Sequence, residues 1–242
     1  MTMLEGQVAV VTGASSGIGK AIALGLAAHG AALYLVGRRS EALQAVARAA
    51  KEKSPQVFCS QADLSQDREV KKLLAEIKKN TENVEILIHS AGVVWLGELE
   101  STDAEHLDDH YKTNVRAPYV LTQGLLPRLK SRQGQILFVN SSAGLTARAN
   151  VSQYAASKHA LKAMADSLRE EVNPYGVRVL SLFLGRTASP MQATVCRMEG
   201  KTYRPELLMQ PEDVAAVAVH ALSLPRGVEV TEISMRPMLK SY

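Results

Sequence analysis

The sequence predicts an α/β protein with a doubly wound parallel sheet of seven strands and helices on both faces. Apolar runs alternate with segments of helical periodicity, and this order produces parallel strands joined by right-handed crossovers. Several runs are almost continuously apolar, as in strands that are covered on both faces. The chain has 242 residues, of which 46% are hydrophobic, so it can bury a full core. Because no linker or repeat interrupts the pattern, residues 1–242 are expected to form one domain.

Each predicted element follows from a local pattern. Strands are expected at residues 7–12, 32–37, 56–60, 85–90, 135–140, 177–184 and 229–235. Helices are expected at residues 17–29, 40–53, 67–80, 103–131, 153–173 and 211–223. Pro211 begins the last helix, and Glu212 and Asp213 place negative charge in its first turn, where the helix dipole favours it. Pro118 lies inside the long pattern at 103–131 and should kink or divide that helix. Residues 185–210 have no clear period and are predicted to form a mobile lid over a site.

Composition excludes several classes of function. The net charge is +4, but the basic residues are scattered, so nucleic-acid binding is not expected. No apolar run reaches the ~20 residues that a membrane helix needs, and the N-terminus shows no basic leader. Cys59 and Cys196 lie far apart without metal-ligand spacing, so we expect free thiols, a reducing compartment and a cytoplasmic protein. None of the histidines shows a ligand pattern, and no metal is assigned.

A glycine-rich turn between the first strand and the first helix predicts a phosphate-binding site. Gly13, Gly17 and Gly19 follow the strand in a G-x-x-x-G-x-G spacing. Glycines let backbone N–H groups approach phosphate oxygens, and the helix N-terminus adds a partial positive charge. The other side chains of the turn, Ser15, Ser16 and Ile18, are expected to contact the same ligand.

The end of the second strand predicts which dinucleotide is bound. An acidic residue usually holds the ribose 2′-hydroxyl there, but this chain has Arg38 and Arg39. Two guanidinium groups can instead bind a 2′-phosphate. The pattern therefore favours NADP(H) over NAD(H), with Arg38 as the main contact; the alternative is that both arginines only decorate the next helix.

Tyr154 and Lys158 predict proton chemistry. They are four residues apart in a helical pattern and therefore share one face. A nearby ammonium favours the phenolate, so a tyrosine that normally ionises near ~10 can exchange a proton near neutral pH. By itself this spacing also fits a helix with a surface lysine, and the other motifs are needed to decide.

Together these motifs resemble those of the short-chain dehydrogenase/reductase family in its compact, single-domain form, over nearly the whole chain. Residues 12–19 match the family's T-G-x-x-x-G-x-G. Ser141, which starts an S-x-x-G pattern, and Asn114 complete a tetrad with Tyr154 and Lys158. Asp63, followed by Leu64, matches the acid that contacts adenine. The resemblance implies a Rossmann-like fold and a homo-oligomer, a tetramer or dimer, built on the helices that carry Asn114 and Tyr154.

The resemblance also implies a mechanism in which hydride passes between a nicotinamide and a carbonyl carbon or carbinol. Tyr154 would donate or remove the proton on oxygen, and Ser141 would hydrogen-bond that oxygen. Lys158 would bind the nicotinamide ribose and lower the pKa of Tyr154. Asn114 would hold a water in a relay from Lys158 to solvent.

One departure from the family pattern follows the fourth strand, where the family's N-N-A-G is replaced by His89-Ser90-Ala91-Gly92. Ser90 keeps a hydrogen-bonding side chain, and Ala91 and Gly92 keep the close approach of the backbone to the cofactor. The support of the strand is expected to differ because His89 replaces an amide.

A second departure follows the sixth strand, where Leu184-Gly185 replaces the family's P-G and makes the turn beside the nicotinamide less rigid. Ser189 stands where the family has threonine, and Thr187 lies two residues earlier. Either hydroxyl is a candidate for holding the carboxamide. The C-terminus lacks the family's D-G-G ending.

The sequence favours an NADP(H)-dependent oxidoreductase that interconverts a carbonyl and a secondary alcohol. Trp95, Met191 and Tyr203 are predicted to line the substrate pocket, although core packing explains each of them as well. The alternative function is a non-catalytic NADP(H)-sensing or scaffold protein on the same fold. The substrate and the physiological direction stay open.

Overall fold

The computed structural model describes residues 4–239 and contains one parallel sheet with the strand order β3-β2-β1-β4-β5-β6-β7. The strands are β1 (Val8–Thr12), β2 (Ala32–Gly37), β3 (Val57–Gln61), β4 (Ile86–His89), β5 (Gln135–Ser141), β6 (Arg178–Leu184) and β7 (Glu232–Met235). All six pairings are parallel. The predicted seven-stranded, doubly wound fold is confirmed; the outermost residues of the predicted domain, 1–3 and 240–242, lie outside the described residues.

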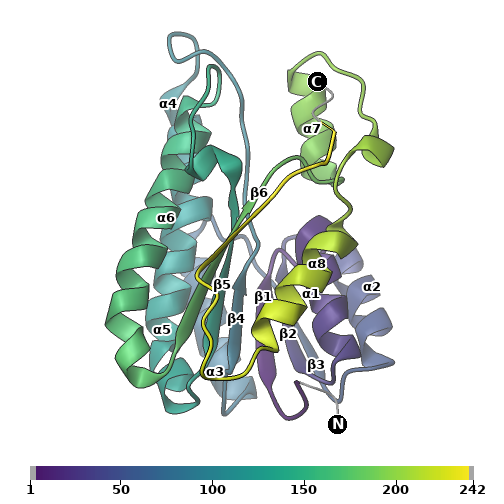
Figure 1. Ribbon diagram of the computed structural model, residues 1–242, viewed down its shortest axis with the longest axis vertical. Coiled ribbons are helices and arrows are strands. Elements are labelled where there is room, and N and C mark those ends of the chain that lie inside the picture. Colours follow the sequence, from purple (N-terminus) through teal and green to yellow (C-terminus); the bar gives the residue numbers. More distant parts are fainter. Residues whose placement is uncertain (1–3, 240–242) are drawn as a thin grey trace.

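Helices cover both faces of this sheet (Figure 1). One face carries α1 (Gly17–Ala28), α2 (Ser40–Lys51) and α8 (Pro211–Leu222). The opposite face carries α3 (Asp67–Asn80), α5 (Ala117–Ser131) and α6 (Ser152–Val172). The chain reverses its winding direction between β1 and β4, which opens a crevice at the carboxyl ends of these two strands.

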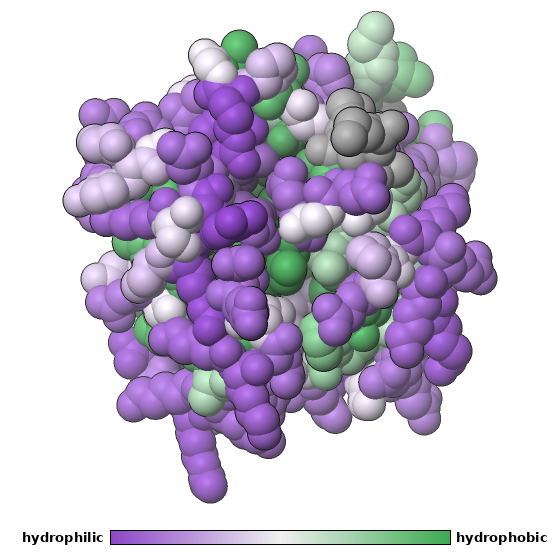
Figure 2. Space-filling model, turned by 90° about the horizontal axis from the view of Figure 1, so that it is seen from below, coloured by the Kyte–Doolittle hydropathy of each residue, from purple (hydrophilic) through white to green (hydrophobic). Residues whose placement is uncertain are grey.

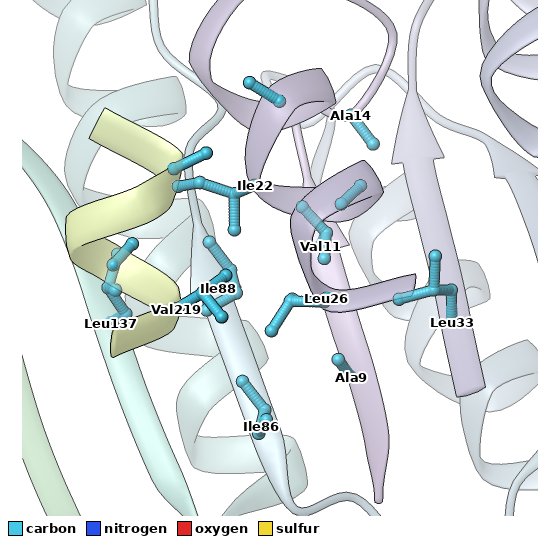
Figure 3. Packing of buried hydrophobic residues seen from close by; sticks show 14 of the residues in the cluster. Ala9, Val11, Ala14, Ile22, Leu26, Leu33, Ile86, Ile88, Leu137 and Val219 are labelled. Carbon is cyan, nitrogen blue, oxygen red and sulfur yellow. The ribbon is translucent and has the colours of Figure 1, made fainter. Parts of the chain in front are cut away.

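The two-sided core explains why the strands read as continuous apolar runs. Along β1, Ala9 and Val11 belong to the cluster under α1 and α8, whereas Val10 belongs to the cluster on the other face. Figure 3 shows Ile22 and Leu26 of α1 lying over the side chains of β1 and β4. Since neighbouring side chains of a strand point to opposite faces, every position of β1 is apolar for a separate reason.

The helical pattern at 103–131 is divided, as the sequence predicted for Pro118. It forms α4 (Ala104–His110), a π-helical segment η1 (Tyr111–Arg116) and then α5, in whose first turn Pro118 lies. Proline has no N–H and cannot donate to the carbonyl four residues earlier, which here belongs to Asn114. The helix widens at this point, and such π segments often occur at functional sites.

Residues 185–210 are more regular than the sequence indicated. They include α7 (Pro190–Met198) and the short 3₁₀ helix η4 (Pro205–Leu207). The Oγ of Ser189 accepts a hydrogen bond of 3.1 Å from the backbone N–H of Gln192 and so caps α7. The prediction of an irregular segment was wrong here because a serine N-cap followed by proline was not recognised as a helix start. The last strand is also shorter than predicted.

The ends of the molecule differ in character. Helices α4 and α7 stand at one end, beyond the carboxyl ends of the strands (Figure 1). Figure 2 views the other end, whose surface is mainly hydrophilic with apolar side chains in small groups. Within residues 4–239, no helix is long and apolar enough to cross a membrane.

Gly13 fixes the glycine turn against the end of β4. Its φ is +68°, and a Cβ built on it would lie 2.7 Å from the backbone nitrogen of Ala91 and 2.8 Å from the carbonyl carbon of Ser90. Both a left-handed backbone and a close backbone contact therefore require glycine at this position.

Gly13→Ala should consequently lower the free energy of unfolding by about 2–5 kcal/mol, the sum of left-handed strain and overpacking. Gly6→Ala is the matched control, because Gly6 has a φ of +77° but nothing within 4 Å of its added Cβ. The control should lose only the strain, about 1–2 kcal/mol. Urea unfolding measures both, and equal losses would contradict the close contact at Gly13.

Candidate active site

A cleft of about 1080 Å³ opens at the carboxyl ends of the strands. It is lined by every residue that the sequence analysis assigned to cofactor binding: Gly13, Ser15, Ser16, Gly17, Ile18, Gly19, Arg38, Arg39, Asp63, Leu64, Ser90, Ala91, Gly92, Tyr154, Lys158, Gly185, Thr187 and Ser189. This volume lies at the upper end of the usual range for ligand sites, which suits a dinucleotide together with a second molecule.

The glycine turn is tied to the neighbouring strand by Thr12, whose role the sequence analysis missed. Its Oγ1 donates to the carbonyl of Ile88 at 3.2 Å and accepts from the backbone N–H groups of Ser90 and Ala91 at 3.1 and 3.2 Å. The first turn of α1 contains no acidic residue, so its N–H groups and dipole face the cleft without a competing carboxylate.

Arg38 and Arg39 follow β2 at the rim of the cleft, and both are exposed. The side chain of Gln61 fixes the backbone here by donating from Nε2 to the carbonyl of Arg38 at 3.0 Å. Asp63 lies farther along the same rim, where its Oδ1 accepts a bond of 3.0 Å from the N–H of Ser65. The rim therefore presents two guanidinium groups to solvent.

The residues that the sequence predicts to transfer protons meet in the same cleft. Tyr154 and Lys158 lie one turn apart on α6, and Ser141 ends β5. The Nζ of Lys158 donates to the carbonyl of Val139 at 3.1 Å and lies 5.9 Å from the centre of the Tyr154 ring. Three of the four tetrad side chains thus line one cleft together with the glycine turn.

The expected lowering of the tyrosine pKa was wrong for this arrangement. Burial raises the pKa of Tyr154 above its ordinary value, and a hydrogen bond with the Ser141 side chain acts in the opposite direction. Burial also lowers the pKa of Lys158 to about 8. The physical reason is desolvation, which disfavours the charged form of both groups at once.

Asn114 does not line the cleft. Its buried amide accepts from the N–H of Val93 at 2.9 Å and donates to the carbonyl of Val93 and the Oγ of Ser157, both at 3.1 Å. These bonds occupy the amide, so a water would be held by the backbone carbonyl, to which Pro118 cannot donate an α-helical hydrogen bond. The role of Asn114 in holding a water stays a prediction.

At the substrate end, Trp95 and Met191 line the cleft as predicted, but Tyr203 does not. The sequence analysis missed further apolar lining residues, namely Val93, Val94, Leu96, Val151 and Val195. Arg186 also reaches this wall, where its Nη2 forms a bidentate ion pair of 2.6 and 2.7 Å with Glu199. The charge of Arg186 is therefore largely balanced by protein groups.

His89 replaces an amide of the family pattern by filling the core beneath Ser90. Its ring is stacked on Phe138 with the ring centres 4.9 Å apart, and its Nε2 lies 2.8 Å from the Oγ1 of Thr122. Burial lowers the pKa of His89 to about 3, so the ring is neutral. The end of β4 is supported by the stacking of His89 on Phe138 and by its hydrogen bond with Thr122.

The turn after β6 is held by the neighbouring strand in place of a proline. The N–H of Gly185 donates to the carbonyl of Met235 at 2.7 Å, and Thr187 Oγ1 donates to the carbonyl of Gly185 at 3.2 Å. Ser189 is occupied as the cap of α7. Both hydroxyls line the cleft, so the choice between them stays a prediction. Among residues 4–239, no group of three or more His, Cys, Asp or Glu side chains is arranged to hold a metal.

Fold and site together define an oxidoreductase of the doubly wound α/β class. Residues 7–200 match the short chain dehydrogenase family model. An uncharacterised oxidoreductase of Staphylococcus saprophyticus is 31% identical over 240 residues, which cover 98% of this chain and 100% of that protein. A homologue from Staphylococcus aureus is 30% identical over 239 residues, with 98% and 100% covered. The chain belongs to the short-chain dehydrogenase family.

Solved structures agree with this assignment. An alcohol dehydrogenase from the archaeon Thermococcus sibiricus, complexed with 5-hydroxy-NADP, superposes with a TM-score of 0.88 at 25% identity, over 98% of each chain. A metagenomic short-chain oxidoreductase in complex with NADP gives 0.84 at 30% identity, over 98% of this chain and 100% of the other. A short chain dehydrogenase from Burkholderia cenocepacia in complex with NADP gives 0.85 at 28% identity, over 96% and 97%.

The buried ammonium of Lys158 predicts a pH dependence of stability. Its pKa is about 8 in the folded protein, against an ordinary value of 10.5. Between these values the unfolded chain binds more protons, so the contribution of this group to stability rises with pH. From pH 8 to 10, the free energy of unfolding of the wild type should rise relative to that of Lys158→Met by about 2 kcal/mol. A pH-independent difference in urea unfolding would refute this assignment.

Proposed function

We propose that this chain is an NADP(H)-dependent oxidoreductase that interconverts a carbonyl and a secondary alcohol, with Tyr154 as the general acid and base. One observation carries the proposal: Ser141, Tyr154 and Lys158 line the same cleft as the glycine turn and Arg38. A site that only stored a nucleotide has no use for a half-buried phenol and a buried ammonium beside an apolar wall.

The residues present fit an NADP(H) molecule. A Cβ on Gly19 would lie 2.4 Å from the carbonyl oxygen of Gly13, so only glycine lets the turn pack this closely on the start of α1. The N–H groups at this helix N-terminus would bind a pyrophosphate. Arg38 and Arg39 would hold the 2′-phosphate, and Asp63 would contact the adenine. Three similar structures contain NADP or its 5-hydroxy derivative, which supports the same cofactor here. When bound, the nicotinamide supplies or accepts the hydride.

The protein's own contribution is a proton held at the phenolic oxygen of Tyr154. Burial raises the pKa of this group, so the phenol is protonated at neutral pH and can donate to a developing alkoxide. Ser141 would hydrogen-bond the same oxygen, where charge develops in the transition state. Lys158 would bind the ribose and, with the backbone carbonyl of Asn114 and a water, return the proton to Tyr154.

The segment 185–210 is proposed to close over the bound substrate. Its helix α7 contributes Met191 to the cleft wall, and the Arg186–Glu199 ion pair ties the start of the segment to the residue after α7. Residues 186–199 would therefore move together with α7. A cytoplasmic location and assembly into a tetramer or dimer stay predictions of the sequence and the resemblance.

Removal of the phenolic hydroxyl tests the central role. Tyr154→Phe should lower kcat at least about 100-fold while the Kd for NADPH changes less than about twofold, because general acid catalysis is lost and the ring remains. Tyr175→Phe is the matched control, since it removes an exposed phenol that does not line the cleft. NADPH oxidation with a panel of carbonyl compounds measures turnover.

Two results would contradict the proposal. A Tyr154→Phe variant with the wild-type rate would remove Tyr154 from catalysis. Tight NADPH binding by the wild type without turnover of any carbonyl in the panel would favour a sensing or scaffold role.

Reversal of the charge at Arg38 tests the choice of cofactor. Arg38→Asp should weaken NADPH binding at least about tenfold, because charge-assisted bonds to a phosphate contribute roughly 1.5–3 kcal/mol, and should leave NADH binding nearly unchanged. Arg48→Asp makes the same charge change at an exposed position of α2 away from the cleft. Equal affinity of the wild type for NADPH and NADH, measured by fluorescence titration, would end the NADP(H) assignment.

A further inference from the structure

The segment 92–97 leaves β4 and forms a wall at the substrate end of the cleft, and one helical region holds it at two points. The N–H of Val93 donates to the Oδ1 of Asn114 at 2.9 Å. Two residues later, the N–H of Trp95 donates to the Nε2 of His110 at 3.1 Å. His110 and Asn114 are four residues apart, on α4 and η1, and therefore share one face. They bind the N–H groups of two alternate residues of the segment.

The hydrogen bonds of His110 fix its protonation state. Its Nδ1 lies 2.5 Å from the carbonyl oxygen of His106, which can only accept, so Nδ1 carries a proton. Its Nε2 accepts from Trp95 and therefore carries none. His110 is completely buried. It is a neutral imidazole with both nitrogens in use.

The same ring lies against the proposed proton donor. The ring centres of His110 and Tyr154 are 5.7 Å apart and tilted by 59°. On the outer side, the Trp95 indole is stacked on His106 with the ring centres 4.4 Å apart. His110 itself does not line the cleft, so it acts through Trp95 and Tyr154.

We propose that neutral His110 is a positioning residue that holds the Trp95 wall and the Tyr154 ring in register, and that its protonation releases the Trp95 wall and weakens substrate binding in acid. This proposal deepens the proposed function, and its catalytic consequences rest on it. Protonation gives the ring a second N–H group, which is on Nε2 and points at the N–H of Trp95. Two donors then face each other, and the bond is lost.

The charges around His110 keep it neutral at physiological pH. Burial lowers its pKa, and the bond to the His106 carbonyl raises it. The imidazole of His106 on α4 and the ammonium of Lys158 on α6 also lower the pKa, whereas the carboxylate of Asp109 raises it. From α6 the phenol of Tyr154 also faces the ring, and the segment 92–97 carries no charged side chain. The transition is therefore expected below the ordinary histidine value of ~6.5.

Trp95 provides a readout that does not depend on turnover, because it is the only tryptophan of the chain. The measurement uses a His106→Phe background, which keeps a ring beside the indole and removes the other imidazole near Trp95. In this background, Trp95 emission should change on acidification below pH ~6.5. Adding His110→Gln, whose amide oxygen can still accept from Trp95, should abolish that change. Circular dichroism at each pH confirms that the proteins are folded.

An emission change that persists in the double variant, or that is absent from the His106→Phe protein, would overturn the proposal. Hydrogen exchange at neutral pH gives a second test that needs no acid. Peptides covering 92–97 should exchange at least about fivefold faster in His110→Leu than in the wild type, and His110→Gln should restore slow exchange. Equal exchange in His110→Leu and the wild type would also overturn it.

Enzyme kinetics test whether the bond between His110 and Trp95 affects the reaction. His110→Leu should raise KM for the carbonyl compound more than it lowers kcat, leave the Kd for NADPH unchanged, and be rescued by His110→Gln. Loss of the acid limb of kcat/KM in His110→Gln is expected as well. If the wild type turned over no substrate, the proposed function would fail, whereas the fluorescence and exchange experiments would still decide the role of His110.

Discussion

Desolvation of Tyr154 and Lys158 is the constraint on which the site depends. Among residues 4–239, neither group has an ion-pair partner that offsets its desolvation: Lys158 donates to a backbone carbonyl, and Tyr154 interacts with the Ser141 hydroxyl. The phenol therefore stays protonated, and the ammonium is poised to lose its proton near pH 8. A cofactor ribose and a substrate oxygen would supply the polar partners that these groups lack, which is how a folded cleft favours binding and proton transfer together.

The backbone around these two groups is fixed by short side chains. Thr12 ties the ends of β1 and β4 together, and Asn114 holds the chain as it leaves β4. One turn before Asn114, His110 holds the same segment at Trp95. His110 ends α4, and Asn114 lies in the π-helical segment that follows it. One irregular helical region thus holds the chain that leaves β4 at both Val93 and Trp95.

The sequence was sufficient for the sheet, the glycine turn and the division at Pro118, because each leaves a local pattern of apolar spacing, glycine or proline. It was also sufficient to name Tyr154, Lys158 and Ser141 as residues that meet in one cleft, whereas their catalytic roles stay predictions. It did not give the pKa direction of Tyr154, since burial depends on side chains from distant strands. Nor did it show that the side-chain amide of Asn114 forms its hydrogen bonds with Val93 and Ser157. Helix α7 was missed although Ser189 and Pro190 are typical of a helix start. The hydrogen bond of His110 to Trp95 was also missed, although His110 precedes Asn114 by one helical turn.

A crystal structure with NADPH bound tests the central claim most directly. The account predicts that the nicotinamide ring lies beside the hydroxyl of Tyr154, that Lys158 leaves the Val139 carbonyl for the ribose, and that Arg38 contacts the 2′-phosphate. A nicotinamide ring bound away from Tyr154, or a phenol that points out of the cleft in the complex, would contradict the claim that this buried pair performs the chemistry.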